Sequence, residues 1–318
     1  MDVIGVDLGG TKIAGGIISE AGKIIKKETI DIKKMKGAEV SKSIGQLISS
    51  LLEYGNRNSL KIMSAGVSVP GIYYSESGKV WAPNIKNWEK YPLLEDLEKK
   101  FENLAIKIDN DRACYILGET WQGIAKDCKN AIFIAVGTGI GAGIMVDGNI
   151  IRGSHDIAGA TGWMALGRPF KKGYKKFGCF EYHSSGDGLA RSALDFMQEA
   201  KNYNGALRKI SPDKLTSYDI FREYEIGDII ARMVINQAVQ LWGMAAANFI
   251  SLFNPEMIIF GGGVFGPAAK LINEIKKEVG KWAQPIAFEQ VSIATTNLGS
   301  NAGLIGAGKL AFNAIADK

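Results

Sequence analysis

Hydrophobic and polar positions along the chain predict strands and helices in alternation. Short apolar runs such as "VIGVDL" and "IFIAV" predict buried strands, whereas apolar residues over 38–54 recur at the spacing of one helix face. Further strands are expected at "KIMSAGVSV", "AIKID", "MIIF" and "VSIATT". Further helices are expected over 93–101, from Arg112, within 188–253, over 267–282 and from Asn301. This alternation indicates an α/β fold with mixed sheets.

One supersecondary unit occurs twice in the sequence. Residues 16–25, "GIISEAGKII", align with residues 143–151, "GIMVDGNII", with one gap, and each stretch follows an apolar strand and a glycine-rich turn. The polar segment 118–129 then loses helical periodicity. We therefore expect an N-terminal α/β domain over 1–118 and a C-terminal α/β domain over 119–300. The final helix, over about 301–318, is a candidate to pack on the first.

An uncharged stretch, residues 233–253, raises the question of a membrane span. It contains five amide or hydroxyl side chains, and its apolar residues follow a helical stripe, which favours a buried core helix. The opening "MDVIGVDLGG" lacks the basic and apolar regions of a signal peptide. We expect no membrane partner and a cytoplasmic location.

Composition narrows the class of protein. The 318 residues suit two domains, and 46% hydrophobic with 22% charged residues is typical of a globular protein. The net charge of +5 comes from scattered lysines without a basic run, so we expect no nucleic-acid partner. Three irregularly spaced cysteines indicate reduced thiols.

The motif "DLGGTK", which starts at Asp7, lies between two predicted strands and therefore matches neither a Walker loop nor a dinucleotide-binding turn. The amides of Gly9 and Gly10 can approach phosphate oxygens. Thr11 adds a hydroxyl group and Lys12 a positive charge, and Asp7 is a candidate to hold Mg²⁺ through water. Taken alone, the motif is explained equally well by a simple hairpin turn.

Two more glycine turns strengthen the phosphate-binding interpretation. "GTGIG" occupies the equivalent place in the second copy of the repeated unit, so the two hairpins are expected to face each other across a cleft and hold one polyphosphate. A strand followed by three glycines and a helix would place helix N-terminal amides near a nucleotide. The residues of these two turns are Gly137, Thr138, Gly139, Gly141, Gly261, Gly262 and Gly263.

With these turns, the sequence resembles the ROK family of bacterial sugar kinases, within the actin-like ATPase and hexokinase superfamily. The resemblance runs nearly end to end, through "DLGGTK", "GVSVPG", "APNI", "NDRACYILGE", "VGTGIGAGI", "RGSHDIAG", "NPEMIIFGGGV" and "LGSNAGLIGAG". It implies two duplicated ribonuclease H-like domains around an ATP cleft, ATP and Mg²⁺ as cofactors, and a homodimer. The implied reaction transfers the γ-phosphoryl group of ATP to a hydroxyl of a hexose, hexosamine or related polyol.

Asn110 and Asp111 lie at the predicted strand-to-helix step, where the family has its sugar-binding Asn and its catalytic Asp. A sugar hydroxyl is a weak nucleophile, and a nearby carboxylate can orient it and accept its proton during phosphoryl transfer. An Asp before this helix would also cap it, and both roles can hold. The resemblance further implies that Gly71, Asn84 and Glu181 bind sugar.

The family pattern breaks after residue 158. In the family, a Glu and a His that touch sugar hydroxyls precede a cysteine knuckle, and the cysteines bind structural zinc with that His. Here Ala160 stands for the Glu and Trp163 for the His, while Lys172 and Tyr174 replace two cysteines. We expect no structural zinc, because a tetrahedral site needs four ligands. A substitute site from His155, Cys179 and His183 lacks an evident fourth ligand.

These losses change the expected sugar pocket. Each missing hydrogen-bond partner costs about 1 to 3 kcal/mol, so glucose is expected to bind less well than in a family member with the usual pocket. Trp163 is a candidate to stack on a sugar. It is equally a candidate to fill the space left by zinc, together with Phe170, Tyr174, Phe177 and Phe180. The lysines of "FKKGYKKFG" are expected in a solvated loop rather than an anion site.

Two other functions are compatible with the family resemblance. A regulator of the same family would carry a helix-turn-helix domain ahead of the first phosphate motif, which here starts at Asp7. A sugar-binding pseudokinase is suggested by Ala160 and Trp163 but opposed by Asp111 and the two glycine hairpins. The leading hypothesis is an ATP-dependent sugar kinase with an altered pocket, whose sugar the sequence does not name.

Overall fold

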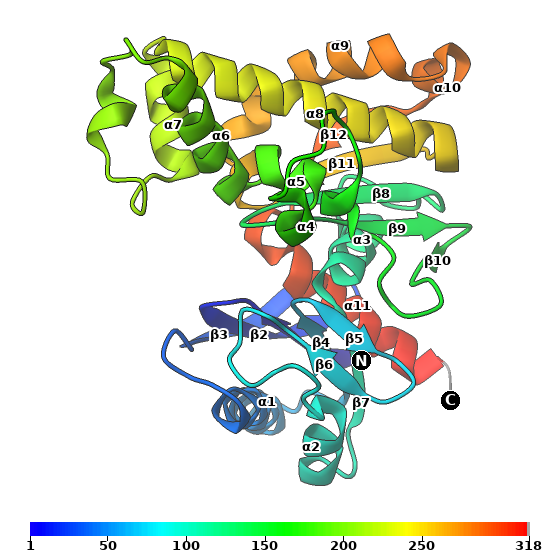
Figure 1. The fold of residues 1–318 in the computed structure, drawn as a ribbon. Helices are drawn as coiled ribbons and strands as arrows, with labels where there is room; N and C mark the ends of the chain where they lie inside the picture. Colours follow the sequence, from blue (N-terminus) through cyan, green and yellow to red (C-terminus); the bar gives the residue numbers. More distant parts are fainter. Residues whose placement is uncertain (317–318) are drawn as a thin grey trace. The chain divides into compact units, whose positions relative to one another are not determined.

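The computed structural model describes residues 1–316 and divides the chain into two units (Figure 1). The first unit contains Met1–Cys128, the segment Ile150–Ala158 and the described residues from Asn297 on. The second unit contains Lys129–Asn149 and Gly159–Thr296. The chain therefore passes between the units more than once, and the boundary expected at residue 118 stays a prediction.

Each unit is built on a five-stranded sheet of the same topology. The first sheet has the order β3-β2-β1-β4-β7, with β1 antiparallel to β2 and parallel to β4. The second has the order β10-β9-β8-β11-β12, with β8 antiparallel to β9 and parallel to β11. The duplicated unit and the mixed α/β fold predicted from the sequence are thus confirmed.

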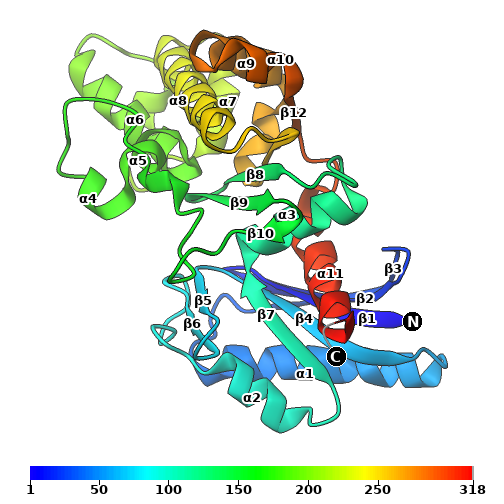
Figure 2. The same cartoon turned by 90° about the vertical axis from the view of Figure 1, so that its right-hand side faces the viewer.

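The first unit contains the elements β1 (Asp2–Leu8), β2 (Lys12–Ser19), β3 (Ile24–Asp31), α1 (Ala38–Arg57), β4 (Ile62–Val69), β5 (Ile72–Tyr74), β6 (Lys79–Trp81), α2 (Leu93–Lys100), β7 (Ala105–Asn110), α3 (Asp111–Gln122) and α11 (Ala302–Ala316). Helix α1 lies on one face of the sheet and α11 on the other (Figure 2). The apolar stripe of α1, with Ile44, Leu47 and Leu51, is completely buried against β1 and β2.

The second unit contains β8 (Ala131–Val136), β9 (Ile140–Val146), β10 (Asn149–Ile150), α4 (Tyr174–Phe177), α5 (Cys179–Ser184), α6 (Gly186–Glu199), α7 (Ser217–Glu225), α8 (Ile229–Phe253), β11 (Met257–Gly261), α9 (Ile272–Trp282), α10 (Pro285–Gln290) and β12 (Ser292–Thr295). Helix α8 contains the uncharged stretch, and its Val234, Ala238 and Trp242 are buried in the core. None of the helices over residues 1–316 is long and apolar enough to span a bilayer.

Two details differ from the sequence-based expectation. The segment from Gly118 to Gln122 continues helix α3, although its polarity suggested a break, because Gly118 and the buried Glu119 pack inside the first unit. The helix expected over 267–282 is divided into a 3-10 turn, Pro267–Leu271, followed by α9. The final helix packs on the first sheet through Leu304 and Ala311.

Glycines allow α11 to approach β1, β4 and α3 at backbone distance. A β-carbon at Gly66 of β4 would lie 1.9 Å from the carbonyl oxygen of Ala307, and one at Gly5 of β1 would lie 2.5 Å from that of Leu304. On the helix side, a β-carbon at Gly306 would lie 1.7 Å from the carbonyl oxygen of Cys114 in α3. These contacts exclude every residue larger than glycine.

We therefore expect Gly306→Ala to lower the free energy of unfolding by about 2 kcal/mol or more, since the clash is with rigid backbone. Gly45→Ala is the matched control, because Gly45 is also helical and its β-carbon would meet only the flexible end of the Lys100 side chain. The control should be neutral or gain up to about 1 kcal/mol from helix propensity. Urea denaturation measures both changes, and equal stability of the two variants would contradict this account of the packing.

Candidate functional site

The first glycine turn follows a half-buried carboxylate near the end of β1. Asp7 accepts a hydrogen bond of 2.8 Å from the Ser68 hydroxyl, and the amide of Gly9 closes the turn on the carbonyl of Lys12 at 2.9 Å. Gly303, in the first turn of α11, approaches so closely that a β-carbon there would lie 2.6 Å from Cγ of Asp7. Burial raises the pKa of Asp7, although the Ser68 hydrogen bond and Lys12 oppose this shift. The turn residues Gly10, Thr11 and Lys12 are exposed.

Three consecutive polar residues follow at the step from β7 to α3. Asn110 is the N-cap of α3, and its Oδ1 accepts a hydrogen bond of 2.9 Å from the amide of Ala113. Asp109 is 2% exposed and forms an ion pair with Arg152. Asp111 follows as the first helical residue, so the capping role belongs to Asn110 rather than to Asp111.

Asp111 is the accessible carboxylate of this step. Its side chain is 28% exposed, and its Oδ1 accepts the amide hydrogen of Arg112 at 2.8 Å. Burial raises the pKa of Asp111 to about 6; Arg112 works against this shift, and the negative charge of Asp7 adds to it. Asp111 therefore changes charge close to neutral pH.

Gly71 and Asn84 are both in the first unit. Gly71 has a φ of 86°, a β-carbon there would lie 2.1 Å from the carbonyl oxygen of Trp81, and its own carbonyl accepts a 3.0 Å hydrogen bond from Arg112. This bond ties the Gly71 turn to the residue beside Asp111. Asn84 is exposed, and its β-carbon lies 3.9 Å from the position of a β-carbon on Gly10.

A cavity of about 290 Å³ opens in the second unit. Its walls come from the β8–β9 hairpin, the starts of α6 and α7, and the turn after β11. They are formed by Gly137, Thr138, Gly186, Asp187, Leu215, Thr216, Ser217, Tyr218, Gly263, Val264 and Pro267. Two of the glycine motifs found in the sequence therefore meet in one cavity.

The other predicted glycines of the second unit serve the backbone around this cavity. A β-carbon at Gly261 would lie 2.3 Å from the Phe133 ring, and one at Gly262, whose φ is 90°, would lie 2.5 Å from the carbonyl oxygen of Val136. Gly141 lies in β9 opposite Ala135. These residues pack behind the cavity and are absent from its lining.

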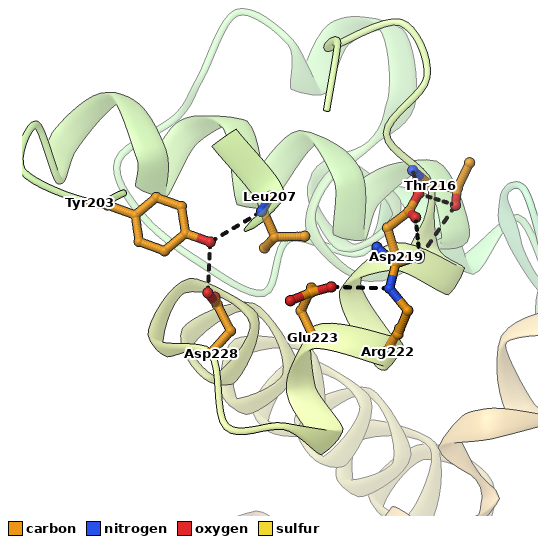
Figure 3. Close-up of polar contacts among 7 residues, drawn as sticks. All are labelled: Tyr203, Leu207, Thr216, Asp219, Arg222, Glu223 and Asp228. Carbon is orange, nitrogen blue, oxygen red and sulfur yellow. Dashed lines mark hydrogen bonds and ion pairs between the residues drawn. The ribbon is translucent and has the colours of Figure 1, made fainter. Parts of the chain in front are cut away.

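The wall formed by α7 was missed in the sequence. Thr216 caps α7 in a capping box: its hydroxyl donates to Asp219 at 2.7 Å, and Asp219 also accepts the Thr216 amide at 3.0 Å (Figure 3). Arg222 bonds Asp219 at 2.9 Å. The Thr-x-x-Asp pattern "TSYD" is a capping-box signal, but no sequence pattern indicated that this helix faces a cavity.

A second set of contacts holds the next helix beside α7. The Tyr203 hydroxyl donates to Asp228 at 2.7 Å and accepts the amide of Leu207 at 3.3 Å (Figure 3). Asp228 in turn caps α8 through the amide of Ala231 at 2.9 Å. The capping box thus holds the start of α7, where Thr216, Ser217 and Tyr218 line the cavity, and the Tyr203 contacts hold the start of α8.

An aromatic and histidine cluster holds the segment around α4, α5 and α6. The Tyr174 hydroxyl lies 2.8 Å from Nε2 of His183, and Nδ1 of His183 lies 3.2 Å from the Ser192 hydroxyl. Burial lowers the pKa of His183 to about 4. Phe180 is completely buried beside this cluster. Over residues 1–316, no three His, Cys, Asp or Glu side chains gather closely enough to hold a metal ion.

Trp163 and Phe170 do not fill space, contrary to one sequence-based interpretation. Trp163 is 56% exposed and Phe170 is 65% exposed, whereas Tyr174 is buried. The filler interpretation is therefore wrong for these two residues. The backbone of Trp163 is instead packed closely on that of Gly178. A β-carbon on Gly178 would lie 2.6 Å from Cα of Trp163.

The duplicated sheets and glycine hairpins define an α/β phosphotransferase fold, and comparison with known proteins gives the family. The ROK family model matches residues 3–314. A glucokinase from Halalkalibacterium halodurans is 33% identical, covering 96% of this chain and 94% of that protein. One from Thermotoga maritima is 30% identical, covering 98% and 97%. A ROK glucokinase structure from Streptomyces griseus, with glucose and AMPPNP, has a TM-score of 0.79 at 26% identity, covering 98% of this chain and all of that one. The chain belongs to the ROK family.

The raised pKa of Asp111 gives a test of its environment. A carboxyl group whose folded pKa lies near 6, above the unfolded value of 3.8, contributes stability below the unfolded pKa that is lost as pH rises through the folded one. Asp111→Asn removes this titration. We expect the variant to gain stability relative to the wild type as pH rises from about 4 to about 7. Urea denaturation at several pH values measures the difference, and a gap independent of pH would contradict the shift.

Proposed function

We propose that this ROK protein is an ATP-dependent sugar kinase in which Asp111 is the general base. The observation that carries this proposal is the carboxylate of Asp111, which is partly exposed, has a pKa near 6 and lies beside Asn110 at the start of α3. A base with a pKa just below neutral is deprotonated at working pH and still accepts a proton readily. In this role Asp111 accepts the proton of the sugar hydroxyl as the phosphoryl group transfers.

The nucleotide is proposed to bind in the cavity of the second unit. Its apolar side chains, Leu215, Val264 and Pro267, suit a nucleobase, and Tyr218 adds an exposed aromatic ring. Gly137 and Thr138 offer backbone amides and a hydroxyl for phosphate oxygens. The first hairpin is proposed to bind phosphate through Gly9, Gly10, Thr11 and Lys12.

Sugar binding is assigned to Asn110, Asn84, Gly71 and Glu181, with the exposed Trp163 as a stacking candidate. The support is local: Arg112, the residue after Asp111, donates a hydrogen bond to the carbonyl of Gly71. Ala160 offers no hydrogen-bonding side chain, so we expect a substrate that does not depend on an acceptor there. The pseudokinase alternative is not favoured, because the chain keeps Asp111 and both hairpins. A homodimer is proposed from the family alone.

Mg²⁺ is proposed to bind near Asp7. Mg²⁺ keeps several waters and needs only one or two carboxylates together with substrate phosphates, so the half-buried carboxylate of Asp7 fits this demand. The pKa of Asp7 is raised because its ionised carboxylate is poorly solvated. A nearby cation would stabilise the ionised form. When bound, the ion would neutralise charge on the phosphates; Asp7 would hold it through water, and Ser68 orients the carboxylate.

We expect Asp111→Asn to lower kcat by roughly 100-fold or more, because the amide cannot accept the proton. In the wild type, kcat/KM should fall about tenfold per pH unit below about 6, where Asp111 becomes protonated. A coupled assay of ADP formation over a panel of hexoses, N-acetylhexosamines, deoxy sugars and inositols measures both. Full activity of Asp111→Asn would exclude it as the base, and a wild type that no sugar stimulates would refute the kinase proposal.

Tyr218 tests the nucleotide site separately. We expect Tyr218→Ala to raise KM for ATP about tenfold while KM for the sugar stays unchanged, since loss of one stacked aromatic ring costs about 1 to 2 kcal/mol. Tyr218→Phe keeps the ring and should stay near wild type. Tyr73→Phe, in the first unit, is the control. If Tyr218→Ala left KM for ATP unchanged, the nucleobase of ATP would not stack on the Tyr218 ring.

A further inference from the structure

The phosphate hairpin between β8 and β9 is fastened at both ends to the junction of α5 and α6. At its start, the carbonyl of Gly137 accepts the amide of Gly186 at 2.7 Å. At its end, the amide of Ile140 donates to Oε2 of Glu181 at 2.8 Å. Gly137 and Gly139 also close the turn on each other at 2.9 Å. Between these two anchors lie the backbone groups proposed to bind phosphate.

The anchor at Glu181 is tightly enclosed. A β-carbon on Gly139 would lie 2.7 Å from Oε2 of Glu181, and a β-carbon on Gly162 would lie 2.9 Å from both Cβ and Oε2 of the same residue. Burial raises the pKa of Glu181, while its bond to Ile140 and the charge of Arg191 favour the ionised carboxylate. Both glycines therefore leave just enough room for this carboxylate to reach the hairpin.

Helix α5, which carries Glu181, is itself held from both sides. His183 bridges Tyr174 and Ser192 through its two ring nitrogens. The indole nitrogen of Trp242 in α8 donates to the carbonyl of Ser184 at 3.1 Å. Glu181 therefore connects the firmly packed helix α5 to the hairpin. The cluster of Tyr174, His183 and Ser192 helps to hold α5 in place.

We propose that Glu181 is a positioning residue for the phosphate hairpin and sets the affinity for ATP through the Ile140 amide. This inference rests on the proposed function, because it assumes that the hairpin binds the phosphates of ATP. It differs from the role in sugar binding implied by the family, because it acts without any sugar. The same residue can serve both ligands, since Oε2 holds the hairpin and the carboxylate has a second oxygen.

The test measures the affinity of the full chain for AMPPNP by titration calorimetry, with MgCl₂ present and sugar absent. We expect Glu181→Ala to weaken binding roughly tenfold, because the Ile140 amide loses its acceptor and the hairpin its anchor. Glu181→Gln keeps a carbonyl oxygen for this amide and should bind within about threefold of the wild type. Glu199→Ala, the same change at the exposed end of α6, should bind as the wild type does.

A double-mutant cycle keeps the test meaningful if Glu181→Ala is less stable. Gly139→Ala should also weaken AMPPNP binding, because its methyl group meets the carboxylate of Glu181. In the Glu181→Ala background the methyl group has room, so Gly139→Ala should cost much less there, and the two effects should be less than additive. Thermal denaturation confirms that each variant is folded.

Three outcomes are distinguishable. Weakened binding in Glu181→Ala, rescue in Glu181→Gln and a less than additive cycle support the positioning role. Unchanged AMPPNP affinity in Glu181→Ala, with a higher KM for the sugar, overturns it and leaves Glu181 as a sugar ligand alone. Failure of the wild type to bind AMPPNP refutes the proposed nucleotide site, on which the inference depends.

Discussion

Close packing of α11 against β1, β4 and α3 is the constraint on which the first unit depends. Glycines at Gly5, Gly66 and Gly306 let the backbones meet directly at these points, while the side chains of Leu304 and Ala311 pack on the sheet beside them. This packing places the start of α11 next to Asp7. It also fixes the position of α3, whose first residue is Asp111. Two carboxylates are thereby held in a poorly solvated place, which raises both pKa values. The chemistry proposed for the site follows from that desolvation.

The second unit repeats the sheet topology but supports its hairpin differently. The turn after β1 is closed by its own backbone and lies beside α11, whereas the turn after β8 is attached to α5 and α6 through Glu181 and Gly186. The capping box of α7 adds a rigid wall with Thr216. The two units therefore share the arrangement of strands and turns. The helices that contact the turn after the first strand differ between them.

A packed aromatic and histidine cluster holds the segment around α4, α5 and α6. Tyr174, His183 and Ser192 form a buried hydrogen-bonded chain. Burial keeps His183 neutral at physiological pH, because its pKa lies near 4. A neutral histidine with both ring nitrogens bonded stabilises the loop without adding charge. Trp163 stays exposed and free to meet a ligand.

The sequence by itself determined the α/β class, the duplicated strand and turn unit and the main strands of both sheets, because apolar periodicity and glycine turns are local signals. It did not predict the end of α3 or the division of the helix expected over 267–282. It also indicated Asp7, Asp111 and the glycine hairpins as candidates. Only the tertiary structure decided that α7 lines the cavity with Tyr218, that Asn110 rather than Asp111 caps α3, and that Glu181 reaches the Ile140 amide. These contacts join residues from separate elements, and their hydrogen bonds and burial depend on packing that no single stretch of sequence specifies.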